Sequence, residues 1–390
     1  MTGVAYIMGS KLNREHIQCG SLHRLPFSFR RVFSKPHKAA PVIGDGNGTY
    51  IMTQDEVEQE DTDEAVGTGT LEVVESGEEA LPEEQPKWAD VDHSKLYVWV
   101  ADTGNDRIQK FDGNGKFLFQ FGKSAGTRPP YCEGLFKGPF GVAVDKEDNI
   151  WVADTGCHRI QKFDPEGDFI LSVGTEGWGQ EKFYWPEAIL AEPGGTILVA
   201  DTHNHSLKRY DDDGEYLLGF GFPGDFDGFC KFPTGVAVDQ EGNIYVADRD
   251  NQRVQIFNEN GQFLSKFGEY GFEEGRFNFP CDLTVRNDGT LLVVEKSQNR
   301  MQLFDREGNF IRVVGEFGKR DGQFNCPMAV VEDPYGFVFV VDTLNHRIQK
   351  LDPDLNFIAK WGSVGNEEKQ FSNPSGLCLS WEPDWAPMDE

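Results

Sequence analysis

One phrase recurs six times over the last three quarters of the chain. One copy is VADTGCHRIQKFD, at residues 152–164. The first two copies are 52 residues apart, and each later interval is 47 residues. Self-similarity at such a period is typical of a solenoid or a propeller, in which each unit buries its apolar faces against its neighbours. The acid at the same place in each copy is Asp102, Asp154, Asp201, Asp248, Glu295 or Asp342.

The pattern of strands inside one repeat decides between these two architectures. Residues 139–174 contain four short apolar segments, PFGVAVD, IWVADTG, HRIQKFD and FILSVG. The turns DGNG, PEGD, DDDG, NENG and REGN supply the Gly, Asn and Asp residues that tight hairpins need. Four short antiparallel strands in each unit predict the blade of a β-propeller.

The two ends of the repeat region complement each other. The first repeat has three strand segments and lacks the inner one. A matching segment, NPSGLCLS at residues 373–380, is followed by no second strand. The sequence therefore predicts an all-β, six-bladed β-propeller of four-stranded antiparallel blades. The C-terminal strand 373–380 joins the first blade and closes the ring, so that no sheet edge is left at the seam.

The first 90 residues differ from this region in composition. Residues 1–40 carry seven Lys and Arg against one acid, whereas residues 41–95 carry two Lys against 16 acids. High charge with few aromatic residues is typical of disorder. We expect a disordered arm over residues 1–90, basic over 1–40 and acidic over 41–90, followed by a propeller over 91–390. The basic part fits either an organelle presequence or a flexible arm, and the acidic part either a solvated tail or a docking segment for a basic partner.

Charge and cysteine content restrict the class of function. Residues 96–390 carry 28 Lys and Arg against 48 acids, a net charge of −20 that would repel a phosphate backbone and disfavours nucleic-acid binding. The seven cysteines form no CxxC pair and fit reduced, buried thiols. No apolar run approaches the roughly 18 residues of a membrane span. We expect an intracellular, cytoplasmic protein without a cofactor, with organelle targeting as the alternative and the oligomeric state open.

The repeated phrase resembles the NHL repeat. Its form here is P-x-G-(V/L)-A-V-D, then I-(W/Y)-V-A-D-T-x-N-x-R-I-Q-K-F, then G-x-(F/Y)-(L/I), over about 290 of the 390 residues. WD-type repeats would show Gly-His and Trp-Asp marks in each blade, and neither recurs. The resemblance implies a binding face, because NHL proteins commonly bind protein or RNA partners on the face that carries the loops between blades.

An arginine follows the repeated acid by five residues in five of the six copies. Such a pair can hold the hairpin between the second and third strands with charge-assisted hydrogen bonds, and a catalytic residue would be needed only once. We therefore predict structural hairpin pairs and no catalytic residue. The pairs are Asp102 with Arg107, Asp154 with Arg159, Asp248 with Arg253, Glu295 with Arg300, and Asp342 with Arg347.

Two irregularities supply the candidate partner-binding residues. The third copy, VADTHNHSLKRYD, has Ser206 where the arginine belongs, and the first interval has five extra residues in the loop of residues 122–138. The alternatives to a functional role are that the third copy has drifted from the repeat and that the longer loop is inert. Arg and Tyr often anchor interfaces. The predicted partner-binding residues are Arg128, Tyr131, His203, His205 and Arg209.

Aromatic residues in the segments between blades fall into two groups. A Phe recurs one or three residues before the proline of each segment, which predicts that Phe183, Phe232 and Phe277 pack between blades. The aromatics that do not recur are candidates for a contact surface: Trp178, Phe222, Phe226, Phe229, Tyr270 and Phe272.

An enzyme of this propeller type would be the alternative function. In the peptidyl-hydroxyglycine amidating lyases, histidines after the proline of Pro-x-Gly hold zinc. The matching positions here contain no histidine, and Glu187 with Cys281 makes a poor zinc set, so we predict no metal site. We predict a non-catalytic protein-interaction scaffold that binds through its loop rim. A metal-dependent lyase or hydrolase at the channel mouth, and RNA binding, are the alternatives. The positions of this chain that match the zinc-binding histidines of the lyases are Phe140, Glu187, Thr234, Cys281, Met328 and Ser375.

Overall fold

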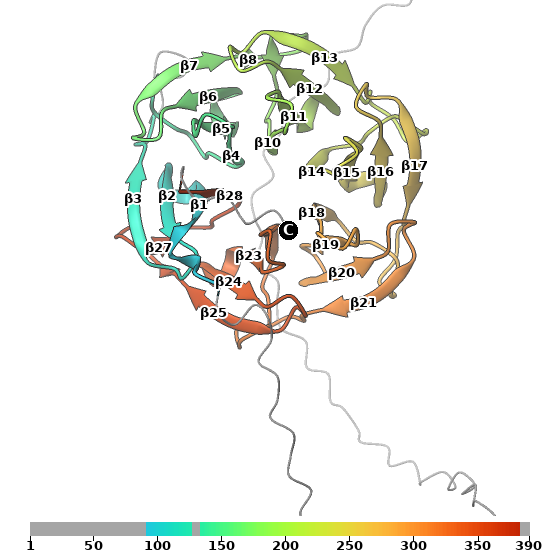
Figure 1. The fold of residues 1–390 in the computed structure, drawn as a ribbon. Helices are drawn as coiled ribbons and strands as arrows, with labels where there is room; N and C mark the ends of the chain where they lie inside the picture. Colours follow the sequence, from blue (N-terminus) through green and yellow to red (C-terminus); the bar gives the residue numbers. More distant parts are fainter. Residues whose placement is uncertain (1–90, 127–132, 383–390) are drawn as a thin grey trace, which may run out of the picture. The chain divides into compact units, whose positions relative to one another are not determined.

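The computed structural model describes residues 91–126 and 133–382 of the chain. Within these residues, six four-stranded sheets form a ring around a central axis (Figure 1). All neighbouring strands of the blades are antiparallel, as the pairings of β5 with β6 and of β6 with β7 illustrate. The predicted six-bladed propeller is confirmed. The predicted arm of residues 1–90 lies outside the described residues and stays a prediction.

Each blade runs from an inner strand beside the axis to an outer strand at the rim. Blade 1 consists of β28 (Leu377–Trp381), β1 (Leu96–Asp102), β2 (Arg107–Asp112) and β3 (Phe117–Phe121). Blade 2 consists of β4 (Val142–Val144), β5 (Ile150–Asp154), β6 (Arg159–Phe163) and β7 (Phe169–Val173). Blade 3 consists of β10 (Ile189–Ala191), β11 (Ile197–Asp201), β12 (Ser206–Tyr210) and β13 (Tyr216–Phe220).

The other three blades repeat this order. Blade 4 consists of β14 (Pro233–Val238), β15 (Ile244–Asp248), β16 (Arg253–Phe257) and β17 (Phe263–Phe267). Blade 5 consists of β18 (Pro280–Val285), β19 (Leu291–Glu295), β20 (Arg300–Phe304) and β21 (Phe310–Val314). Blade 6 consists of β22 (Pro327–Glu332), β23 (Val338–Asp342), β24 (Arg347–Leu351) and β25 (Phe357–Trp361).

Short elements fill the connections. Two small parallel sheets pair β8 (Thr175–Glu176) with β9 (Lys182–Phe183), and β26 (Ser363–Val364) with β27 (Gln370–Phe371). The 3-10 helices are η1 (His93–Lys95), η2 (Thr103–Asn105), η3 (Thr155–Cys157), η4 (Thr202–Asn204), η5 (Arg249–Asn251) and η6 (Thr343–Asn345).

The ring closes where the sequence predicts. Strand β28 pairs antiparallel with β1, so that Leu379 lies opposite Val98. The indole nitrogen of Trp99 donates a hydrogen bond of 2.9 Å to the hydroxyl of Ser380, across 281 residues of sequence. The C-terminal strand therefore covers the inner edge that β1 would otherwise expose.

The apolar core lies between the blades. All five residues of β5 and all five of β6 are buried, because neighbouring blades cover both faces of each sheet. Six apolar clusters result, each shared by two adjacent blades; Trp151 of blade 2, for example, shares one with Ile197 of blade 3. Outer strands such as β7 alternate half-buried and exposed residues, since only one face is covered.

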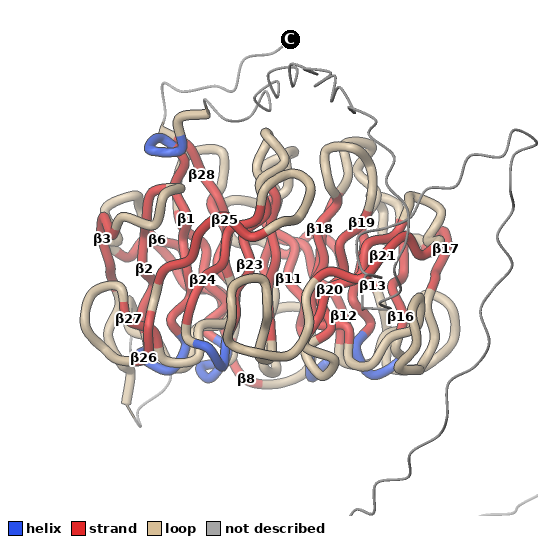
Figure 2. The backbone as a smooth tube through the Cα atoms, turned by 90° about the horizontal axis from the view of Figure 1, so that it is seen from below, coloured by secondary structure: helices blue, strands red, loops and turns tan. Residues whose placement is uncertain are grey.

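The alternation of strand directions gives the ring two different faces. We call one the loop face. It contains the loops between blades (residues 122–126, 133–141, 174–188, 221–232, 268–279, 315–326 and 362–376) and the turns between the second and third strands. The opposite, turn face contains the tight turns between the other strands of each blade. In Figure 2 most of the 3-10 helices gather at one end of the ring, which is the loop face.

The described residues contain five cysteines, and none of them forms a disulfide. No helix in residues 91–126 or 133–382 is long and apolar enough to cross a membrane.

Candidate functional site

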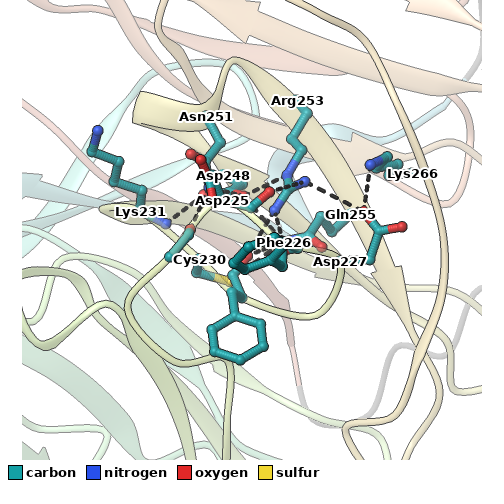
Figure 3. A network of polar contacts seen from close by, with 12 residues as sticks. Asp225, Phe226, Asp227, Cys230, Lys231, Asp248, Asn251, Arg253, Gln255 and Lys266 are labelled. Atoms are coloured by element: carbon teal, nitrogen blue, oxygen red, sulfur yellow. Dashed lines mark hydrogen bonds and ion pairs between the residues drawn. The ribbon is translucent and has the colours of Figure 1, made fainter.

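The repeated acid is the centre of a buried hydrogen-bond network, shown for blade 4 in Figure 3. The carboxylate of Asp248 accepts hydrogen bonds from the backbone amide of Lys231 at 2.6 Å and from the Asn251 side chain at 2.8 Å. It also accepts from Nε of Arg253 at 2.8 Å and from Nε2 of Gln255 at 3.0 Å. Burial raises the pKa of Asp248, and these donors oppose that shift.

The same network holds the loop between blades 3 and 4. Arg253 donates to the carbonyl oxygens of Asp225 at 3.0 Å and of Phe226 and Phe229 at 2.8 Å each. Gln255 donates to the Phe229 carbonyl at 2.7 Å. One acid thus connects a hairpin of its own blade to the loop that enters the blade, and we call this arrangement the loop anchor.

All five acid–arginine pairs named from the sequence lie within ion-pair distance. The distance from the arginine Nε to the carboxylate oxygen is 2.7 Å for Arg107–Asp102, 2.9 Å for Arg159–Asp154, 2.8 Å for Arg253–Asp248, 2.7 Å for Arg300–Glu295 and 2.7 Å for Arg347–Asp342. Sequence reasoning missed the glutamine partners, although each stands seven residues after its acid. They are Gln109, Gln161, Gln255, Gln302 and Gln349.

Blade 3 has an anchor although Ser206 stands at the arginine position, because a lysine pairs with its acid. The ammonium group of Lys208 lies 2.7 Å from Oδ2 of Asp201. It also donates to the carbonyl oxygens of Gly179, at 2.6 Å, and of Lys182. Lys208 stands at the glutamine position and replaces both the arginine and the glutamine. Ser206 therefore leaves no buried acid unpaired.

The predicted partner-binding residues do not form one surface. His203 and His205 lie in the turn around η4 on the loop face. Arg209 points to the turn face, where its guanidinium donates to both carboxylate oxygens of Glu192 at 2.6 and 2.7 Å. Arg209 is therefore corrected from a rim-loop residue to one that braces a turn on the other face. Two further predicted residues, Arg128 and Tyr131, lie outside the described residues.

His205 links two blades. Its backbone has a φ of 55°, and its Nδ1 accepts a hydrogen bond of 3.0 Å from the backbone amide of Phe232. The same acceptor role recurs in His158, whose Nδ1 accepts from the amide of Trp185 at 3.1 Å. Burial lowers the pKa of both histidines, which favours the neutral ring that can accept this bond.

Exposed aromatic side chains gather in four consecutive loops of the loop face. Phe226 is 75% exposed and Tyr270 is 59% exposed, although large aromatic side chains are usually buried. We call this set the aromatic arc. It consists of Trp178, Trp185, Phe222, Phe226, Phe229, Tyr270, Phe272, Phe279 and Phe317.

The aromatic residues that precede each proline differ in burial. Phe183 and Phe277 are fully buried, as the packing prediction requires. Phe232 is only partly buried, and the buried place in that loop is taken by Cys230. The sequence missed three members of the aromatic arc, Trp185, Phe279 and Phe317, because exposure depends on the loop conformation and not on recurrence.

A cavity runs along the axis between the inner strands. The six positions after the proline of Pro-x-Gly line it, including Glu187 and Cys281. Within the residues that the structure describes, no group of three or more His, Cys, Asp and Glu residues is arranged to hold a metal ion.

Comparison with known proteins agrees with this architecture. The family model for the NHL repeat matches residues 136–163 and 231–257. Protein brain tumor of Drosophila melanogaster is 44% identical over 57 residues, which are 15% of this chain and 6% of that protein. NHL repeat-containing protein 2 of Bos taurus is 34% identical over 96 residues, 23% of this chain and 13% of that protein. Peptidyl-glycine alpha-amidating monooxygenase A of Xenopus laevis is 33% identical over 114 residues, 28% of this chain and 12% of that protein.

Solved structures share the fold at lower sequence identity. A protein of unknown function from Bacteroides caccae has a TM-score of 0.56 at 15% identity, covering 73% of this chain and 99% of that chain. A chain of a nidogen/laminin complex has a TM-score of 0.53 at 17% identity, covering 73% of this chain and 98% of its own length. These likenesses show the fold alone.

The closed ring, the four-stranded blades and the loop anchor define a class, the six-bladed β-propellers with a repeated acid at the end of the second strand. The family model and the matches to NHL-repeat proteins narrow this class. The chain contains NHL repeats at residues 136–163 and 231–257 and is similar to NHL-repeat proteins. It matches only a small part of the curated relatives, between 6% and 13% of their length.

Proposed function

We propose that this propeller is a non-catalytic protein-interaction module that takes a protein partner on its loop face. The observation that carries the proposal is the aromatic arc, since exposed aromatic side chains are the usual anchors of protein interfaces. Members of the arc come from loops of consecutive blades, so one partner segment can contact several of them.

The loop anchors support this function physically. Arg253 and Gln255 hold the backbone on both sides of the exposed Phe226, through the carbonyl groups of Asp225 and Phe229 at 2.7 to 3.0 Å. A loop that is already fixed loses less conformational entropy when a partner binds. The repeated phrase therefore contributes to binding indirectly, because it positions the side chains that would touch the partner.

The test is capture from native lysate with the full chain, identification of the captured protein, and a binding assay with both components purified. The test variant is Phe226→Ser combined with Tyr270→Ser. The matched control is Leu264→Ser, because Leu264 is 51% exposed but lies on the outer strand β17 and outside the loop face. We expect the test variant to lose the purified partner and the control to keep it. Equal binding of both variants would refute a partner site on the aromatic arc.

The extra-loop residues form a second arm of this experiment. Arg128→Ala with Tyr131→Ala removes the two predicted contacts in the long loop before blade 2. Loss of the partner in this variant would extend the contact to that loop. Retention would restrict the contact to the loops between blades 2 and 6.

A further inference from the structure

The axial cavity contains polar groups that the loop-face function does not use. Its volume is about 280 Å³, near the lower end of small-molecule sites. Most lining residues are apolar, for example Val236 on β14, Leu283 on β18 and Val330 on β22. A polar group without a partner in such a wall is costly unless something binds to it.

Asp282 is the first polar group of the cavity, and within the described residues it has hydrogen-bond donors but no cation beside it. It stands on β18 at the place where the neighbouring blade has Gly235, and a Cβ on Gly235 would lie 2.5 Å from the Asp282 Cα. The glycine therefore makes room for both the backbone and the carboxyl group of Asp282. Asp282 accepts a hydrogen bond from the Val330 amide at 2.9 Å, and no ion pair joins it to a cation of the described chain. Burial raises the pKa of Asp282 to about 7, because no positive charge compensates the desolvation.

Thr234 is the second group, and it lies on the strand beside Asp282. Its side chain lines the cavity and is 5% exposed, and its hydroxyl has no hydrogen-bond partner in the described residues. Glu187, on the next strand, also lines the cavity, and burial raises its pKa. Blades 3 to 5 thus contribute two carboxyl groups and this hydroxyl to a cavity whose other polar lining residues are Thr284, Glu332 and Ser375.

The chemistry of these groups selects one class of ligand. A desolvated carboxylate is stabilised most by a cation that also donates hydrogen bonds. A hydroxyl beside it can accept a further hydrogen bond from the same donor. The apolar wall excludes a strongly hydrated ion and favours a ligand with a hydrocarbon part.

We propose that the axial cavity binds a small organic amine, with its ammonium group on Asp282 and Thr234 and its hydrocarbon part against Val236, Leu283 and Val330. This site lies inside the ring, is separate from the aromatic arc, and does not depend on a protein partner.

Calorimetric titration of the full chain with three probes of equal length tests the proposal. The probes are n-hexylammonium, 1-hexanol and hexanoate. We expect hexylammonium to bind to one site about tenfold or more tightly than hexanol, because it adds a charge-assisted hydrogen bond. We expect no binding of hexanoate at about pH 8, where the ionised carboxylate of Asp282 repels it.

Variants locate the site. Asp282→Asn should weaken hexylammonium binding about tenfold or more and leave hexanol binding unchanged. Thr234→Val keeps the shape of the side chain, removes the hydroxyl, and should weaken hexylammonium several-fold. If thermal unfolding shows that the Asp282→Asn variant is not folded, the Thr234→Val variant still tests the proposal. Glu274→Gln, which removes an exposed carboxylate of the loop face, is the control and should have no effect.

Three results would overturn the proposal. They are no binding of hexylammonium to the wild-type chain, equal affinities for hexanol and hexylammonium, and unchanged hexylammonium affinity in the folded Asp282 or Thr234 variants. Equal affinities would describe an apolar cavity without a specific amine site.

Discussion

The ammonium group of Lys208 lies 2.7 Å from Oδ2 of Asp201 and holds in blade 3 the place that an arginine has in the other blades. Lysine starts two residues later in the strand than the missing arginine would. Its long side chain still reaches both the acid and the carbonyl groups of Gly179 and Lys182 in the incoming loop. One cation can therefore serve the loop anchor from either of two sequence positions.

A double substitution in blade 3 tests this equivalence. Lys208→Gln should lower the free energy of unfolding by about 3–5 kcal/mol, because it leaves the buried carboxylate of Asp201 without a cation. Adding Ser206→Arg restores the arrangement of the other blades, with arginine and glutamine on the acid. We expect the double variant to return to within about 1 kcal/mol of the wild-type chain in urea unfolding. Additive effects of the two changes would show that the two positions do not share the acid.

A similar test separates buried from exposed ion pairs in blade 4. Arg253→Ala removes the cation from Asp248 and the donors from three loop carbonyls, and should cost about 3–5 kcal/mol in urea unfolding. Lys266→Ala breaks an exposed pair with Asp227 in the same blade and should cost about 0–1 kcal/mol. A small effect of Arg253→Ala would contradict the role of the anchor in stability.

The C-terminal strand offers a third prediction. Deletion of residues 377–390 removes β28, which exposes the inner edge of β1 and the apolar cluster between blades 1 and 6. We expect an earlier thermal transition and self-association, measured by scanning calorimetry and size-exclusion chromatography. Ser380→Ala is the mild companion change. It removes only the hydrogen bond from Trp99 and should cost about 1 kcal/mol. A truncated chain that melts like the full chain would contradict the seam.

The fold could be predicted from the sequence because its signals repeat. The spacing of the acids, four strand segments in each unit and the match between residues 373–380 and the other inner strands each point to a closed ring of six blades. A single repeat would have left several all-β architectures open. Repetition averages out the variation that makes any one strand ambiguous.

The site was less predictable, for two physical reasons. The role of Arg253 depends on carbonyl groups 24 to 28 residues earlier in the chain, and local sequence does not show which carbonyls a folded loop presents. Lys208 and Arg209 are adjacent cations with opposite orientations, because successive side chains of a strand point to opposite sides. The substitution of Asp282 for a glycine was visible in PCDLTV beside PTGVAV, yet only the cavity gives it a meaning.

The histidines that link the blades predict a dependence of stability on pH. Nδ1 of His158 and of His205 accepts a hydrogen bond from a backbone amide. A proton on that nitrogen would therefore face the amide proton and break the bond. Burial lowers the pKa of each histidine below its ordinary value of 6.5, so the unfolded chain binds protons at a higher pH than the folded chain does. The contribution of the two neutral histidines to the free energy of unfolding is fully present above pH 6.5. It is lost as the pH falls toward the lowered pKa values of the folded state.

Asparagine at both positions isolates this effect. Blade 5 already has Asn299 at the equivalent place, where its Oδ1 accepts from the Cys326 amide at 2.8 Å, and asparagine tolerates the left-handed backbone. We expect His158→Asn with His205→Asn to match the wild-type free energy of unfolding closely at about pH 8 and to exceed it increasingly below about pH 6.5. Urea unfolding of both proteins across this range measures the difference directly and cancels the contributions of the acids. A difference that stays constant with pH would show that these histidines do not titrate as part of the links between blades.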